Sequence, residues 1–412
     1  MSAITPFGAW RPEPHLAYRV AAPPYDVLSS DEARNMARGN PYSFLHVSKP
    51  EIDFPPEAKP DLRAIHARGA ENFRRLVADG VMIRDPKPCF YVYRQRKDDH
   101  VQAGFVAGAS CEEYRTGRIK RHELTRPDKV EDRLIHIESV GAQTGPVFLA
   151  FKSFKPAESL LAEAQARTPI YQFSASDEVE HTVWVIDDPV AIGSIREAFS
   201  DVPFLYIADG HHRSEAASQL SGKMRAENPG QRGIEPCHYF LSVIFPASQL
   251  RIMDYNRVVK DLGGMDRDTF LRRLADRFIV SPTEDPRPPK PKTMTLHLGG
   301  RWYRLEARPG TYPEEDPVRS LDVSVLQENV LSPLLGIENP RTDARIDFVG
   351  GIRGLKELET RCDSPLKAAF ALFPTSMNEL MRVADAGLMM PPKSTWFEPK
   401  LRSGLLVRSI RD

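Results

Sequence analysis

The chain has 412 residues, of which 41% are hydrophobic, and its 56 Lys and Arg residues are balanced by 56 Asp and Glu residues. This length and composition are typical of two or three folded modules and exclude global disorder. The formal net charge of zero excludes a whole-chain field that would gather nucleic acid, although a local basic patch is compatible with it.

Residues 1–110 are predicted to form an N-terminal α/β region. A Ser-x-x-Glu capping box predicts a short helix at 29–38, and apolar residues at helical spacing predict a second helix at 61–79. Two runs of β-forming residues, 89–93 and 102–108, predict strands joined by a charged turn.

Residues 111–281 are predicted to form the core. Short apolar runs alternate here with segments of helical composition, which favours a mixed α/β sheet with flanking helices. The expected strands and helices are strand 147–151, helix 157–166, strand 181–186, helix 191–199, strand 204–208 and helix 211–224.

A proline-rich linker is predicted at 282–292, because this segment is unsuited to both helix and strand. The C-terminal α/β region, 293–412, follows it. Its first part resembles a hairpin around Gly299 and Gly300, and a helix is expected at 365–370.

The strongest chemical signal is the sequence from Asp209 to Arg213, where an apolar strand bends into a helix. Such a junction presents unpaired amides at the helix N-terminus, where the peptide dipoles favour an anion. Gly210 has no Cβ and allows close approach of a ligand, while His211, His212 and Arg213 add donors. We interpret the box as a phosphate-binding turn. The alternative is a helix capped by Asp209, with ordinary first-turn histidines.

A second signal is the charged segment 118–133. A phosphoryl-transfer site needs cations for the phosphate oxygens and carboxylates for a metal or for proton abstraction. Glu123 is the candidate general base, Lys129 and Arg133 are candidate phosphate-binding cations, and Asp132 is a candidate magnesium ligand. The alternative is a solvated helix with salt bridges on its outer face.

Two proline-stiffened segments add further candidates. A Pro-Pro pair fixes Tyr25 and Asp26, which suits substrate contact, although Asp26 in a helix-capping turn is an equal alternative. The Pro- and Lys-rich segment 390–400 carries Lys393, Ser394, Thr395 and Lys400 as anion donors. It lacks the glycine spacing of a P-loop, and packing of its aromatic residues on the core is compatible with ligand contact.

A zinc site is disfavoured, because the sequence has neither an H-x-x-x-H pair nor a His/Cys quartet at a familiar spacing. Magnesium accompanying a nucleotide requires only one or two carboxylates. The side chains weighed as zinc ligands are His122, His211, His212, Cys237 and His238.

Nearly the whole chain resembles the domain-of-unknown-function family numbered 1015. The matching motifs are APPYDV at 22–27, RHELT at 121–125, TGPV at 144–147, ADGHHR at 208–213, RIDFVGG at 345–351 and PPKSTWF at 391–397. The box alone is also similar to the second box of the ParB/sulfiredoxin-like superfamily, in which a Gly-x-x-Arg turn holds nucleotide phosphates. This similarity implies a ParB/sulfiredoxin-like core with elaborations. The box has no cysteine and the chain has no obvious basic helix-turn-helix, which leaves the branch of small-molecule kinases.

We therefore expect a nucleotide-dependent phosphotransferase that uses ATP or ADP with Mg²⁺ and acts on a small hydroxylated metabolite, with free serine first among the candidates. The alternatives are a phosphate- or nucleotide-binding regulator without turnover, and a phosphoesterase or nuclease. The catalytic candidates are Glu123, Asp209, His211 and His212.

The compartment and partners follow from what the sequence lacks. No signal peptide, apolar run of about 18 residues or clustered cysteine framework is evident. We expect a cytoplasmic protein that binds a nucleotide and a small molecule, with neither a membrane nor nucleic acid as a partner. An oligomer is compatible with the sequence.

Overall fold

The computed structural model describes residues 4–362 and 367–411, and the chain forms two compact units. Unit 1 consists of Met1–Leu250 and Pro399–Asp412, and unit 2 is Arg251–Glu398. The chain therefore leaves unit 1 and returns to it after completing unit 2. These units do not coincide with the three predicted regions.

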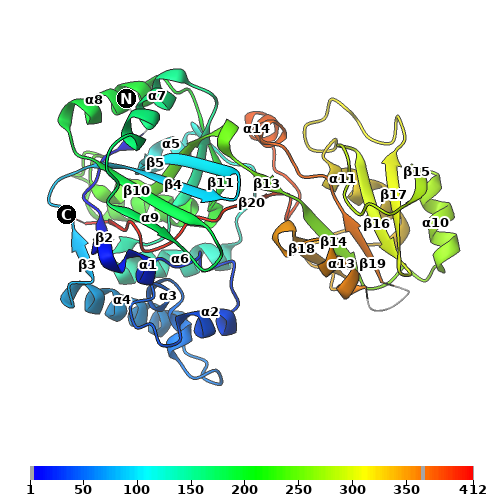
Figure 1. Cartoon of the computed structure of the whole chain (residues 1–412), viewed down its shortest axis with the longest axis horizontal. Coiled ribbons are helices and arrows are strands. Elements are labelled where there is room, and N and C mark those ends of the chain that lie inside the picture. The colour runs from blue at the N-terminus through cyan, green and yellow to red at the C-terminus, as the bar shows by residue number, and fades with distance from the viewer. Residues whose placement is uncertain (1–3, 363–366, 412) are drawn as a thin grey trace. The chain divides into compact units, whose positions relative to one another are not determined.

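Unit 1 is built on a mixed sheet that contains nine strands among the described residues (Figure 1). The strands are β1 (Ile4–Thr5), β4 (Phe90–Lys97), β5 (His100–Ser110), β6 (Ile119–Lys120), β8 (Val147–Phe151), β9 (Tyr171–Ser174), β10 (Glu180–Ile186), β11 (Leu205–Asp209) and β12 (Tyr239–Pro246). Their order is β6-β11-β8-β12-β5-β4-β10-β9, with β1 on β5. Only the pairs β11–β6 and β12–β8 are parallel. The prediction of a mixed α/β sheet with flanking helices is confirmed.

Helices cover this sheet. In Figure 1, α7 and α8 lie above it and α2, α3 and α4 lie below it. The Phe199 ring of α8 meets Phe105 and Phe151 edge-on, each at a centroid distance of 5.6 Å, so large aromatic rings fill the interior on that side. The helices of unit 1 are α1 (Ala17–Val20), α2 (Ser30–Ala37), α3 (Leu45–Ser48), α4 (Leu62–Ala78), α5 (Cys111–Arg115), α6 (Pro127–Val140), α7 (Lys155–Gln165), α8 (Pro189–Ser200) and α9 (His211–Glu227).

Side-chain caps determine where several of these helices begin. Ser29 and Glu32 form the capping box that the sequence predicts before α2. Asp61 and Asp188 accept backbone amides at the starts of α4 and α8. Each cap satisfies a helix-terminal donor that would otherwise lack a partner.

The segment after residue 399 is part of the interior of unit 1. Residues 401–408 are all buried, and β21 (Arg408–Ser409) pairs with β7 (Ala142–Gln143). Backbone bridges join Val407 to Trp10 and Ser403 to Ala22. The segment is therefore bound by backbone hydrogen bonds to the N-terminal part of unit 1. In that part, β2 (Trp10–Pro12) also pairs with β3 (Met82–Arg84).

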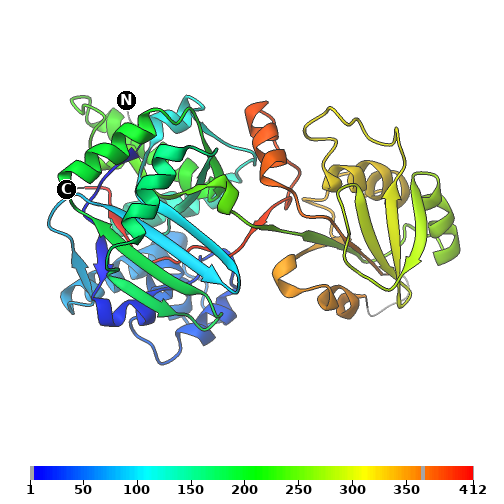
Figure 2. The ribbon, with the colours of Figure 1, turned by 45° about the horizontal axis from the view of Figure 1, so that its top comes forward.

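Unit 2 contains a six-stranded antiparallel sheet among its described residues, with α10 beside it (Figures 1 and 2). Its strands are β14 (Tyr255–Val259), β15 (Phe278–Thr283), β16 (Thr293–Leu298), β17 (Arg301–Ala307), β18 (Ile346–Gly350) and β19 (Ala368–Ala371), and a separate ribbon joins β13 (Ile252–Met253) to β20 (Trp396–Phe397). The order of the sheet is β15-β17-β16-β19-β14-β18. Its helices are α10 (Arg267–Ala275), α11 (Asp322–Leu326), α12 (Ser332–Leu335), α13 (Lys356–Arg361) and α14 (Met377–Asp385).

Two of the elements predicted from the sequence fall in this sheet. The hairpin around Gly299 and Gly300 is confirmed as β16 and β17. The helix expected at 365–370 begins outside the described residues, and it is wrong from Ala368 onward, where the chain is strand β19. The proline-rich segment predicted at 282–292 begins inside β15, whose last two residues are Pro282 and Thr283, and residues 284–292 connect β15 to β16 within unit 2.

No helix in the described ranges is both long enough and apolar enough to cross a bilayer.

Candidate functional site

The box forms the junction between β11 and α9. Gly210 adopts a left-handed conformation (φ 100°), and α9 begins at His211. Gly210 is the N-cap and no side chain caps the helix, so the alternative of an Asp209 cap is wrong. Within the described chain, the amides of His211, His212 and Arg213 have no protein acceptor. Three donors therefore remain available at the positive end of the helix dipole.

The surroundings of this turn are partly closed. Gly210 and His211 are buried, whereas Asp209, His212 and Arg213 are intermediate in exposure. A Cβ at Gly210 would lie 3.2 Å from Arg213 Cζ, so the absence of a side chain here lets the guanidinium pack against the turn.

Asp209 is bound by cations of unit 1. Its Oδ2 atom lies 2.8 Å from Lys400 Nζ, and its Oδ1 atom lies 3.8 Å from a terminal nitrogen of Arg213. Burial alone would raise the pKa of Asp209, but Lys400 and Arg213 hold it well below its usual range. Asp209 is therefore a poor proton acceptor, which leaves Glu123 as the better candidate base.

The loop after β6 lies against the first turn of α9. The His122 amide donates to His211 Nε2 at 3.4 Å, and the Arg126 amide donates to His212 Nε2 at 3.1 Å. Because β6 and β11 are parallel neighbours, the chain leaves both strands at the same sheet edge. Glu123 is thereby brought beside the box.

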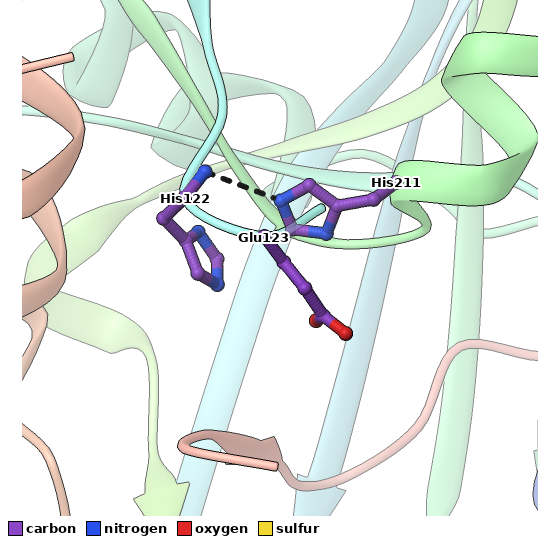
Figure 3. A group of neighbouring side chains, drawn as sticks. All are labelled: His122, Glu123 and His211. Carbon is purple, nitrogen blue, oxygen red and sulfur yellow. Dashed lines mark hydrogen bonds between the residues drawn. The ribbon is translucent and has the colours of Figure 1, made fainter. Parts of the chain in front are cut away.

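His122, Glu123 and His211 form a compact group (Figure 3). Each contributes one nitrogen or oxygen atom, and these atoms all lie within 4.8 Å of one another. The two imidazole rings meet edge-on at a centroid distance of 4.5 Å. Burial lowers the pKa of His122 to about 4 and the pKa of His211 well below its usual value. Both imidazoles are therefore neutral at pH 7.

Arg213 also lines a small cavity. Its volume is about 30 Å³, and Tyr25, Arg133, Thr144 and Ser403 also line it. The guanidinium of Arg133 lies 3.7 Å from the centroid of the Tyr25 ring. Two guanidinium groups at one cavity favour an anion there, and the volume suits only a few atoms.

Arg213 is held in place and still has an unused donor. One terminal nitrogen donates to the Pro146 carbonyl, whereas its buried Nε has no acceptor among the described residues. Asp26 is exposed nearby. Burial lowers the pKa of His212, and the Asp26 carboxylate opposes that shift.

Two predicted site residues, Lys129 and Asp132, lie in surroundings that differ from those expected. Lys129 is exposed on α6. Asp132 uses Oδ1 to bind His66 Nε2 at 2.9 Å and Oδ2 to bind Arg133 at 2.6 Å. Both of its oxygens are thus engaged by protein, so its environment differs from the one expected of a magnesium ligand.

Lys393 and Ser394 belong to unit 2. The Lys393 ammonium lies 5.7 Å from the centroid of the Tyr255 ring. Ser394 is buried and donates to the Pro391 carbonyl at 2.7 Å. These contacts fix residues 391–394 within unit 2.

Sequence reasoning treated Lys400 as an anion donor but missed its pairing with Asp209, and it missed the cavity residue Ser403. Lys400 was one cation of a Lys-rich segment, and Asp209 lies 191 residues before it. No local pattern links two positions that far apart, because the contact arises only when the chain returns to unit 1. The usable sequence signals for the cavity were the TGPV motif, which contains Thr144, and the candidates Tyr25 and Arg133.

Comparison with known proteins gives a family and several distant structures. A family model described as protein of unknown function (DUF1015) matches residues 4–324. A search of the curated proteins gives no match.

Solved structures with similarity to the chain include C-terminally truncated SbnI from Staphylococcus aureus, at 14% identity and a TM-score of 0.38, with 74% of this chain and 87% of that chain covered. A mutant free serine kinase in complex with ADP has 13% identity and a TM-score of 0.37, over 76% of this chain and 96% of that chain. A conserved hypothetical protein from Pyrococcus furiosus has 15% identity and a TM-score of 0.35, over 74% and 95%.

Proposed function

The chain belongs to the DUF1015 family, and for this member we propose a nucleotide-dependent phosphotransferase that acts on a small hydroxylated metabolite, with free serine as the first acceptor to test. One observation carries the proposal: the first three amides of α9 have no acceptor in the described chain and lie beside the buried donor of Arg213. Unpaired amides at a helix N-terminus are a general means of binding phosphate.

The donor would be ATP or ADP with Mg²⁺. Its phosphates would accept hydrogen bonds from the amides of His211, His212 and Arg213, and the missing Cβ of Gly210 lets the Arg213 guanidinium lie against this turn. The guanidinium of Arg213 would add a charge-assisted bond, worth about 1.5–3 kcal/mol. Asp209, held ionised by Lys400 and Arg213, would keep this guanidinium oriented.

The acceptor hydroxyl would lie on the side of Glu123. Glu123 would take the hydroxyl proton as the acceptor oxygen bonds to the terminal phosphorus and the bond from phosphorus to the nucleotide oxygen breaks. Tyr25 and Asp26 would contact the acceptor, and Arg133 would balance charge across the cavity. This chemistry needs only a nucleotide and a small metabolite, which fits a cytoplasmic enzyme.

The direct test incubates the purified full chain with ATP or ADP, Mg²⁺ and a panel of amino acids, and follows phosphoserine by mass spectrometry. Nucleotide binding is measured in parallel by calorimetry. Tight binding without product from any acceptor would indicate a regulator, and phosphate release without an acceptor would indicate a hydrolase. Absence of binding by both nucleotides would overturn the proposal.

Variants of Arg213 and Glu123 separate binding from chemistry. Arg213→Ala should weaken nucleotide binding by roughly 10- to 150-fold. Arg225→Ala is the matched control, because it removes the same charge from an exposed position near the other end of α9. Glu123→Gln should slow turnover by about 10²-fold or more with binding kept. Normal turnover in Glu123→Gln would refute its role as base.

A further inference from the structure

The group formed by His122, Glu123 and His211 has the chemistry of a metal site. One histidine and the glutamate come from the loop after β6, and the other histidine comes from the first turn of α9. Figure 3 shows the three side chains extending into one space between these two segments. The sequence disfavoured zinc because it has no ligand pair at a familiar short spacing. Here the two histidines are 89 residues apart and meet only in the folded chain.

The buried imidazole of His122 requires an explanation. Its side chain is 2% exposed, and neither ring nitrogen has a hydrogen-bond partner among the described residues. The Ile207 carbonyl lies close enough to raise the pKa of His122 slightly against the effect of burial, but it does not form a hydrogen bond with either ring nitrogen. Buried polar atoms in folded proteins are almost always paired. A cation that accepts a ring lone pair would satisfy this histidine.

His211 is arranged to complement it. Its Nε2 accepts the His122 amide at 3.4 Å, so in the neutral ring Nε2 carries the lone pair and Nδ1 carries the proton. A cation bound at Nε2 would replace this long amide contact. A metal requires neutral imidazoles, and burial keeps both histidines uncharged at neutral pH.

The donor set selects the class of cation. Two imidazole nitrogens and one carboxylate are the ligands of three-residue catalytic zinc sites and of 2-His-1-carboxylate iron sites. Mg²⁺ prefers oxygen ligands throughout, so the cation expected here differs from the one that accompanies a nucleotide. The three ligand atoms lie within 4.8 Å of one another. Zinc–ligand bonds are only about 2.0–2.2 Å long, so the three side chains must move slightly closer together on binding.

We propose that His122, Glu123 and His211 bind one divalent d-block cation, of which Zn²⁺ is the probe of choice, with a coordination position left open. This inference is independent of the proposed phosphotransfer but constrains it. A Glu123 carboxylate that ligates a cation is no longer a free base, so Zn²⁺ should suppress turnover supported by Mg²⁺ if Glu123 acts as proposed.

The test uses the full chain after dialysis against a chelator. Co²⁺ is titrated by its visible absorption and Zn²⁺ by calorimetry, so the readout is independent of turnover. We expect one Zn²⁺ per chain with a micromolar or tighter Kd, unaffected by excess Mg²⁺. His122→Gln and His211→Gln should each weaken binding by more than about 100-fold.

His238→Gln is the control, because it replaces another buried histidine of unit 1, one whose ring nitrogens contact Ser221 and Gln231. Circular dichroism checks folding, and Glu123→Gln supplies a second ligand variant should His122→Gln not fold. No stoichiometric binding, or binding that the ligand variants retain, would overturn the proposal. Nucleotide affinity measured on the same variants distinguishes this failure from failure of the phosphotransferase.

Discussion

At the scale of single residues, His181 illustrates how burial determines the response of unit 1 to pH. Its Nε2 accepts a hydrogen bond from Arg402 Nε at 3.2 Å, so its proton lies on Nδ1, which is 2.8 Å from the Tyr93 hydroxyl. Burial, with Arg402 adding to it, lowers the pKa of His181 to about 3. Protonation would place two cations in contact in the interior.

This arrangement predicts acid sensitivity. The unfolded chain takes up a proton at His181 near pH 6.5, whereas the folded chain does so only near pH 3. Between these values the unfolded state binds more protons, so the free energy of unfolding falls with falling pH by about 1.4 kcal/mol per unit. Urea unfolding at pH 7.5 and at pH 5 measures the slope. His181→Gln should reduce the slope by the share of one group, because other buried histidines with a lowered pKa still contribute, and replacement of the exposed His15 is the control. An undiminished slope in His181→Gln would assign the effect to other groups.

At the scale of secondary-structure elements, the site is a strand, a left-handed glycine and a helix. The sequence predicted the strand, a tight Asp-Gly turn and the helix, but not the left-handed conformation of Gly210. An apolar run, Asp-Gly and helix-forming residues are local signals, and β11 and α9 begin within a residue of the predicted bounds. The sequence did not reveal β12, the strand beside β8. Seven of its eight residues are buried, so it has no alternation to mark it as a strand.

The helix α9 offers a matched pair of glycines. Gly210→Ala forces a side chain into a backbone with φ 100° and presses on Arg213, so it should cost about 1–2 kcal/mol of stability and weaken nucleotide binding. Gly222 lies in the interior of the same helix with open space around its Cβ position. Gly222→Ala should therefore stabilise the protein by about 0.5–1 kcal/mol and leave binding unchanged. Chemical denaturation measures both, and equal effects of the two substitutions would contradict this account of the turn.

At the scale of the whole molecule, unit 2 is inserted into unit 1. The two ends of the insertion are held at adjacent residues of β5: the Ala103 amide donates to the Gln249 side chain at 2.8 Å, and Gln102 donates to the Pro399 carbonyl at 3.3 Å. Local composition could not reveal this organisation. The proline-rich segment at 282–292 looked like a boundary but connects two strands of one unit, whereas the chain actually crosses between units near 250 and 399.

The insertion predicts unequal effects of two deletions. Replacing 251–398 with a short Gly/Ser linker should leave unit 1 folded, because the ends to be joined are held at neighbouring residues. Removing 399–412 should destabilise it by more than about 5 kcal/mol, because buried side chains such as Leu405, Val407 and Ile410 are lost. Circular dichroism melts of the two variants make the comparison. Greater stability of the second variant would refute the nested arrangement.

The pairing of Asp209 with Lys400 also determines when the site can be completed during translation. The two residues are 191 positions apart, so a ribosome adding about 5–20 residues per second makes the lysine roughly 10–40 s after the aspartate. Throughout that interval the nascent box carries a carboxylate without this counter-charge, and the intervening unit is made first. Competence to hold a phosphate would thus be acquired late in translation, when the returning segment closes over β11.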